Sequence, residues 1–93
     1  MYQLPYDPAK RLRTLNERGF DFEDARLVFA GPHYPWQDTR VDCGETRMLC
    51  FGYLEGRSVI VGYVERKGTH HIFTMKRADD RERKIFGPYV SQE

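Results

Sequence analysis

The stretch TRMLCFGYLEGRSVIVGYVERKGTHHIFTM, residues 46–75, decides the fold of this chain of 93 residues. It is rich in aromatic and β-branched residues, which favour strands, and Glu55-Gly56 and Lys67-Gly68 interrupt it with turn-forming pairs. Strands are therefore predicted over residues 46–54, 57–64 and 69–75. Because each turn is tight, neighbouring strands run in opposite directions, and the stretch predicts an antiparallel β-meander.

Two helices are predicted before this meander. Asp7-Pro8 is typical of a helix start, and Gly19 is typical of the residue after a helix end. Between them, Leu12 and Leu15 form an apolar stripe that we expect to face the core. A second, shorter helix begins after Asp21 and ends at Gly31-Pro32, and its inward residues are expected to be Phe22, Ala25, Val28 and Phe29.

The remaining segments complete an α+β domain. Residues 2–6 are interpreted as a short edge strand, and residues 33–41 as a loop that enters an edge strand at about residues 38–42. A charged helix is predicted from residue 77 to about residue 86, with Asp79/Arg83 and Asp80/Lys84 pairs four residues apart. One domain over residues 1–93 follows, with two N-terminal helices and one C-terminal helix on one sheet face. The other face is then free to present a site.

Composition argues against several classes of protein. No apolar run approaches the length that spans a bilayer, and the N-terminal segment lacks the apolar run of a secretory signal, so we expect a cytoplasmic protein with no membrane partner. Cys43 and Cys50 are expected to be reduced thiols, and with His70 and His71 they lack the spacing of a metal site. The glycines form no phosphate-binding motif. No metal and no cofactor are predicted.

Basic residues gather in the C-terminal half of the chain. From Arg57 to Lys84 there are eight basic residues against four acidic ones, although the whole chain has a net charge of +1. Successive strand residues face opposite sides, so only one of His70 and His71 can join a site, and His71 is preferred. The predicted catalytic residues are Glu45, Arg66, His71, Lys76 and Arg77.

These residue types suit cleavage of RNA without a metal. That reaction needs a base for the 2′-hydroxyl proton, an acid for the leaving oxygen, and cations for the charge of the transition state. Glu45 or His71 is the expected base or acid, and arginine can hold a phosphate through two parallel hydrogen bonds. The residues expected to bind RNA are Trp36, Arg40, Arg47 and Arg57. Trp36 is a candidate for stacking on a base, with a core or partner-interface role as the alternative.

The chain resembles the BrnT family of ribonuclease toxins from type II toxin-antitoxin pairs. The resemblance runs from about residue 6 to residue 86 and rests on the order and spacing of Asp7-Pro8, Lys10-Arg11, Asn16, Gly19, Phe22, Ala25, Asp38, Arg40, Gly44-Glu45, Arg47, Gly56-Arg57, Arg66, residues 72–78 and Glu82. Arg18 and His71 depart from the family pattern, which usually has histidine and arginine there, and Met75 replaces a small residue. Histidine in place of arginine is expected to alter pH dependence or rate.

The resemblance implies a RelE-like ribonuclease fold and growth arrest by RNA cleavage. It also implies a cognate antitoxin that carries a ribbon-helix-helix DNA-binding domain, so operator DNA is contacted only through the toxin-antitoxin complex. The residues alone leave two other classes open. A regulator without catalysis would bind nucleic acid through the same basic cluster, and a protein-interaction module would use the free sheet face to dock a partner helix.

Overall fold

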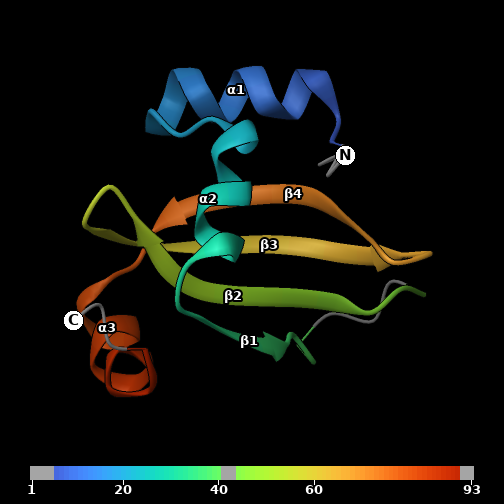
Figure 1. Cartoon of the computed structure of the whole chain (residues 1–93). Coiled ribbons are helices and arrows are strands. Elements are labelled where there is room, and N and C mark those ends of the chain that lie inside the picture. Colours follow the sequence, from blue (N-terminus) through green and yellow to red (C-terminus); the bar gives the residue numbers. More distant parts are fainter. Residues whose placement is uncertain (1–5, 41–43, 91–93) are drawn as a thin grey trace.

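The computed structural model describes residues 6–40 and 44–90 (Figure 1). Its helices are α1 (Pro8–Arg18), α2 (Ala25–Ala30) and α3 (Asp80–Phe86), with short 3-10 turns at Phe22–Asp24 (η1) and Gly87–Tyr89 (η2). Its strands are β1 (His33–Gln37), β2 (Arg47–Leu54), β3 (Arg57–Arg66) and β4 (Thr69–Arg77). They form one antiparallel sheet in the order β1-β2-β3-β4, which confirms the predicted α+β class and meander.

The two predicted hairpin turns lie where the sequence places them. Glu55 and Gly56 both have positive φ, of 51° and 80°, and Lys67 and Gly68 repeat this at 51° and 77°. Positive φ at both central residues is the geometry of turns whose twist matches that of the flanking strands. The turns therefore set the register of β2 against β3 and of β3 against β4.

Helix α1 has the predicted ends but not the predicted packing. Asp7 accepts a hydrogen bond from the Ala9 N–H, and Gly19 ends the helix with a φ of 75°. Leu12 and Leu15 are 58% and 37% exposed, however, so the expectation that they face the core is wrong. The reason is that α1 runs beside the edge strand β4 instead of across the sheet (Figure 1).

Polar contacts tie α1 to the rest of the domain. Arg11 forms an ion pair with Asp21, with its Nε 2.7 Å from Oδ1. Arg18 donates a 3.0 Å hydrogen bond to the carbonyl of Met75 and a 3.2 Å bond to Thr74 Oγ1. The helix is thereby fixed at the sheet edge, with a basic surface next to β4.

The main core lies between the sheet and the segment that contains η1 and α2. Asp21 caps η1 through the Glu23 N–H, and the predicted inward residues Phe22, Ala25 and Val28 are buried, while Phe29 is half-buried. Cys50 is buried in β2, on the same side of the sheet. The other buried members of this core are Phe20, Leu54, Val59, Val61, Tyr63, Ile72 and Met75.

The first edge strand differs from the sequence-based expectation. Strand β1 spans His33–Gln37, so Asp38–Arg40 follow the strand, and residues 41–42 lie outside the described residues. The aromatic segment pairs with β2 because Pro35 is tolerated at a sheet edge, where its missing N–H faces no partner strand. Of the edge strand expected over residues 2–6, only Tyr6 is described, and it forms a parallel bridge with Ile72.

The C-terminal helix begins later than expected and covers the other sheet face. Asp79 and Glu82 form a reciprocal capping box at its start, so Arg77 is the last residue of β4 and not part of the helix. With Asp79 committed to the cap, the expected pairs four residues apart are replaced by an Asp80–Arg83 ion pair. Phe86 packs on a second core built on Phe51, Ile60, Ala78 and Val90. The expectation that all helices share one face is therefore wrong for α3.

Candidate functional site

Most of the predicted site residues lie on the sheet face opposite α2, on the part of that face that α3 leaves uncovered. Strand alternation places Arg47 of β2 in a row with Val64 of β3 and His71 of β4. A register shift after Gly62 inserts one extra residue in β4, so Phe73 and Thr74 both reach over Gly62. This bulge brings an aromatic ring onto the polar face of the sheet.

One depression on this face is built around Lys76. Its volume is about 480 Å³, and its lining is Trp36, Asp38, Arg40, Arg47, Leu49, Ile60, Phe73, Thr74, Lys76 and Glu82. Lys76 lies 3.2 Å from Glu82, and Arg40 is held at 2.8 Å by Asp38. The hydrogen bonds from Arg40 lower the pKa of the buried Asp38 carboxyl, which stays ionised. We call Trp36, Arg40 and Lys76 the lysine site.

A second depression lies at the opposite end of the same face, around His71. Its volume is about 340 Å³, and its lining is Tyr6, Asp7, Lys10, Val64, Arg66, His71, Ile72 and Phe73. Arg66 holds Glu45 through two hydrogen bonds of 2.5 and 2.6 Å, and these bonds are the main reason why the pKa of Glu45 is lowered. The charge on His71 lowers it further. We call Lys10, Glu45, Arg66 and His71 the histidine site.

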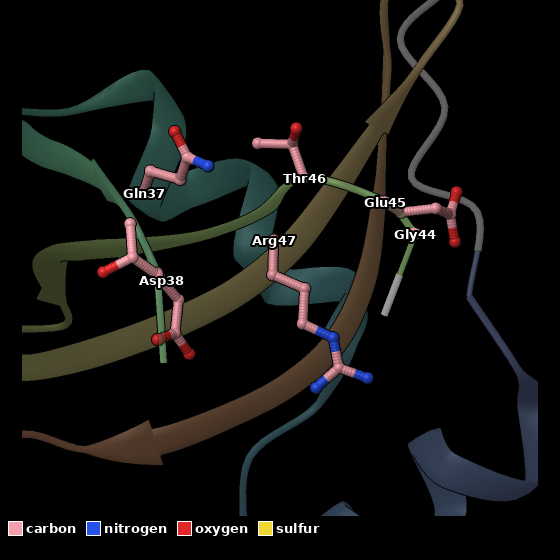
Figure 2. Close-up of a pocket in the computed structure, with 7 residues that line it drawn as sticks. Gln37, Asp38, Gly44, Glu45, Thr46 and Arg47 are labelled. Atoms are coloured by element: carbon pink, nitrogen blue, oxygen red, sulfur yellow. The ribbon is translucent and has the colours of Figure 1, made fainter. Parts of the chain in front are cut away.

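Arg47 lies between the two sites. It lines the depression of the lysine site and, with Asp38 and Glu45, a third hollow of about 360 Å³. Figure 2 shows its guanidinium extending from the start of β2 across the sheet, with Asp38 on one side and Glu45 on the other. The guanidinium carbon also lies 4.8 Å from the centre of the Phe73 ring.

The structure therefore divides the predicted catalytic residues instead of bringing them to one point. Lys76 pairs in register with Ile60, whereas Arg66 lies six residues farther along β3. At about 3.3 Å per residue, roughly 20 Å separates them along the strand. Glu45, Arg66 and His71 share one end of the face, and Lys76 lies at the other.

Two predicted residues lie away from both sites. Arg57 places its guanidinium over the ring of Phe20, a core residue on the α2 side of the sheet. Arg77 follows Lys76, so strand alternation turns it to the opposite face. Arg77 also lies outside α3, which begins at Asp80 and is capped by Asp79.

Sequence reasoning missed Lys10 and Phe73. Lys10 reaches the histidine site only because α1 lies along β4, and no local pattern reports that placement. In the sequence Phe73 looks like an ordinary strand residue, and only the bulge in β4 places its ring on the polar face of the sheet. Trp36 stacks on Phe86 at 4.0 Å, so its packing role and its place in a depression coexist.

The neighbouring residue His70 lies on the face opposite His71, as strand alternation predicts, and the structure gives it a packing role there. It stacks on Tyr63, with ring centres 4.4 Å apart, and makes an edge contact with Phe29 at 4.9 Å, on the core side of the sheet.

Within residues 6–40 and 44–90, no three His, Cys, Asp or Glu side chains are grouped to hold a metal ion. No helix in the same ranges is long and apolar enough to cross a membrane.

Comparison with known proteins places this chain in a family. The model of the family described as "Ribonuclease toxin, BrnT, of type II toxin-antitoxin system" matches residues 6–82. The fold is similar to the 1.1 Å crystal structure of the Brucella abortus ribonuclease toxin BrnT, with a TM-score of 0.63 and 18% sequence identity over 86% of this chain and 100% of that one. No match was found among curated proteins. Because the family model spans most of its length, this chain belongs to the BrnT family of ribonuclease toxins of type II toxin-antitoxin systems.

Proposed function

We propose that this toxin is an endoribonuclease that cleaves RNA without a metal ion, with its chemistry at the histidine site. The observation that carries the proposal is the grouping of His71, Arg66 and Glu45 at one end of the open sheet face. A proton acceptor, a proton donor and fixed cations are the groups that this reaction requires. The lysine site, which lies too far away to touch the same phosphate, binds the rest of the RNA strand.

Glu45 and His71 take opposite roles in proton transfer. The lowered pKa of Glu45 keeps its carboxylate ionised, so the unprotonated form that can accept the proton of the 2′-hydroxyl group is present, although as a weaker base than a free carboxylate. The 2′ oxygen then attacks the neighbouring phosphorus atom, and the bond from phosphorus to the 5′ oxygen breaks. Protonated His71 donates its proton to that departing oxygen. The products are a cyclic 2′,3′-phosphate and a free 5′-hydroxyl group.

Three cations stabilise the negative charge that grows on the phosphate. Arg66 is oriented by its two bonds to Glu45, and Lys10 and Arg47 reach the same end of the face from α1 and β2. Such preorganised donors typically contribute about 10²–10³-fold each to the rate of related reactions. Because these side chains provide base, acid and charge stabilisation, the reaction needs no Lewis acid.

The partners follow from the family. We propose that a cognate antitoxin with a ribbon-helix-helix domain neutralises this chain, and that operator DNA is bound only through that complex. The near-neutral net charge of +1 supports this, because it does not favour general adhesion of the free toxin to DNA. The toxin acts in the cytoplasm, where its RNA substrate is found.

The test compares labelled RNA incubated in chelator with the parent protein, His71→Asn and His33→Asn. His33 is the matched control because its exposed ring, on β1, contacts the Gly31 carbonyl and lies outside both sites. We expect cleavage by the parent and the control, and a loss of about 10²–10⁴-fold in the His71 variant. Loss of parent activity in chelator would contradict metal independence. RNA binding without any cleavage would favour a non-catalytic regulator.

A further inference from the structure

Phe73 lies at the meeting point of the hollows on the open sheet face. It lines the depression of the lysine site, that of the histidine site, and a separate hollow of about 280 Å³ beside α1, distinct from the 360 Å³ hollow at Arg47. The residues of α1 that line this hollow are Lys10, Arg13, Thr14, Glu17 and Arg18. Each of the three depressions that the ring borders therefore has basic side chains in its lining, together with at least one acidic one.

The bulge in β4 and a glycine in β3 hold the ring in this place. A Cβ atom on Gly62 would lie 2.8 Å from Phe73 Cζ and 2.5 Å from Thr74 Cγ2, closer than real side chains approach. Only glycine leaves room there for the Phe73 ring to lie across β3. The ring is half-buried, so part of its surface remains open to a ligand.

Arg47 supplies the second element of a nucleotide-binding site. Its guanidinium carbon lies 4.8 Å from the ring centre of Phe73, and the side chain lines the same 480 Å³ depression. The guanidinium lies over the ring, so a base that stacks on Phe73 takes its place and leaves the cation to bind the adjacent phosphate. The volume lies within the usual range of small-ligand pockets.

We propose that Phe73 is a platform on which one base of the RNA stacks, between the histidine site and the lysine site. This inference rests on the proposed function and names the feature that holds the strand across the two sites. Both candidate rings are covered on one face: Phe86, which packs on the second core, stacks on Trp36, whereas a charged side chain, Arg47, lies over Phe73. A base can displace the charged side chain more readily than the packed ring, so Trp36, the aromatic residue expected from the sequence, is less suited. Stacking requires an unpaired base, so the ligand is single-stranded RNA.

The test measures binding of two labelled oligonucleotides of equal length by the full chain. One is 2′-O-methyl oligouridylate, which has bases but no attacking hydroxyl, and the other is its abasic counterpart. We expect Phe73→Leu, which keeps an apolar contact with Gly62, to weaken oligouridylate binding roughly ten- to hundredfold. Binding of the abasic strand should not change, and Phe73→Trp should restore the affinity for bases.

Tyr89→Leu is the matched control, because Tyr89 is an aromatic residue that is 69% exposed and lines none of these depressions. Equal affinity of the parent and Phe73→Leu for oligouridylate would overturn the inference, and so would an equal loss for both strands. If oligouridylate binds through Phe73 but RNA is never cleaved, the inference stands and the proposed function fails. If RNA is cleaved and Phe73→Leu has no effect on oligouridylate binding, the proposed function stands and this inference fails.

Discussion

Arg66 donates two parallel hydrogen bonds to Glu45, from Nε to Oε2 at 2.5 Å and from Nη2 to Oε1 at 2.6 Å. The two residues are 21 positions apart, and the pair joins the end of β3 to the residue that precedes β2 by two positions. The guanidinium orients the carboxylate and holds its pKa below the usual range. The guanidinium therefore fixes the position of the carboxylate and keeps it ionised to lower pH.

Replacing Arg66 should therefore change how activity depends on pH. In Arg66→Gln, the pKa of Glu45 rises toward its ordinary value, because the cation that favours the carboxylate is gone. As the proposed base, Glu45 can accept a proton only above its pKa, so the acid limb of the kcat/KM profile should move to higher pH. The rate on the plateau should also fall by about 10²–10³-fold, since a phosphate donor is lost. An unmoved acid limb would show that another group accepts the proton.

Lys76 should contribute to binding more than to chemistry, because it lies far from the histidine site. Lys76→Ala is expected to raise KM for RNA severalfold and leave kcat within about twofold of the parent value. The slope of log K against log salt should become shallower by about 0.7, as expected when one phosphate contact to a single strand is lost. Lys84→Ala, on the exposed surface of α3, is the control. A fall in kcat with KM unchanged would place Lys76 in the chemical step instead.

Cys50 should be unreactive in the native protein. It is buried in β2, and burial raises the pKa of its thiol to about 12. At pH 8 only about one molecule in ten thousand then carries the reactive thiolate. In a Cys43→Ser background, alkylation should be negligible at pH 8 and become rapid only when urea unfolds the chain. Rapid labelling without denaturant would show that the core opens locally.

His70→Phe should stabilise the domain without affecting cleavage. The Nδ1 atom of His70 is buried and meets no hydrogen-bond partner among the described residues, and such an atom costs about 1 kcal/mol or more. Phenylalanine keeps the contacts with Tyr63 and Phe29 and removes the polar atom. Urea unfolding should report a free energy of unfolding higher by about 1 kcal/mol. A lower value would mean that the nitrogen forms a hydrogen bond in the native protein.

Local chemistry made much of the fold predictable. The turns at Glu55-Gly56 and Lys67-Gly68 require positive φ, and the strand composition between them leaves an antiparallel meander as the natural outcome. The ends of α1 were predicted at Asp7-Pro8 and Gly19 because capping depends on neighbouring residues only. The basic character of the site was likewise visible in the distribution of charge.

Contacts between segments that are distant in sequence were decided only by the tertiary structure. The exposure of Leu12 depends on α1 lying beside β4, and the position of α3 depends on aromatic packing around Phe86. The bulge that exposes Phe73 arises from the register of β4 on β3, which no local propensity encodes. Residue type alone predicted which side chains suit the chemistry, whereas strand register and helix placement determined that Glu45 meets Arg66 while Lys76 lies apart. These relationships are set by long-range packing, since residues distant in sequence become neighbours only when the whole sheet has formed.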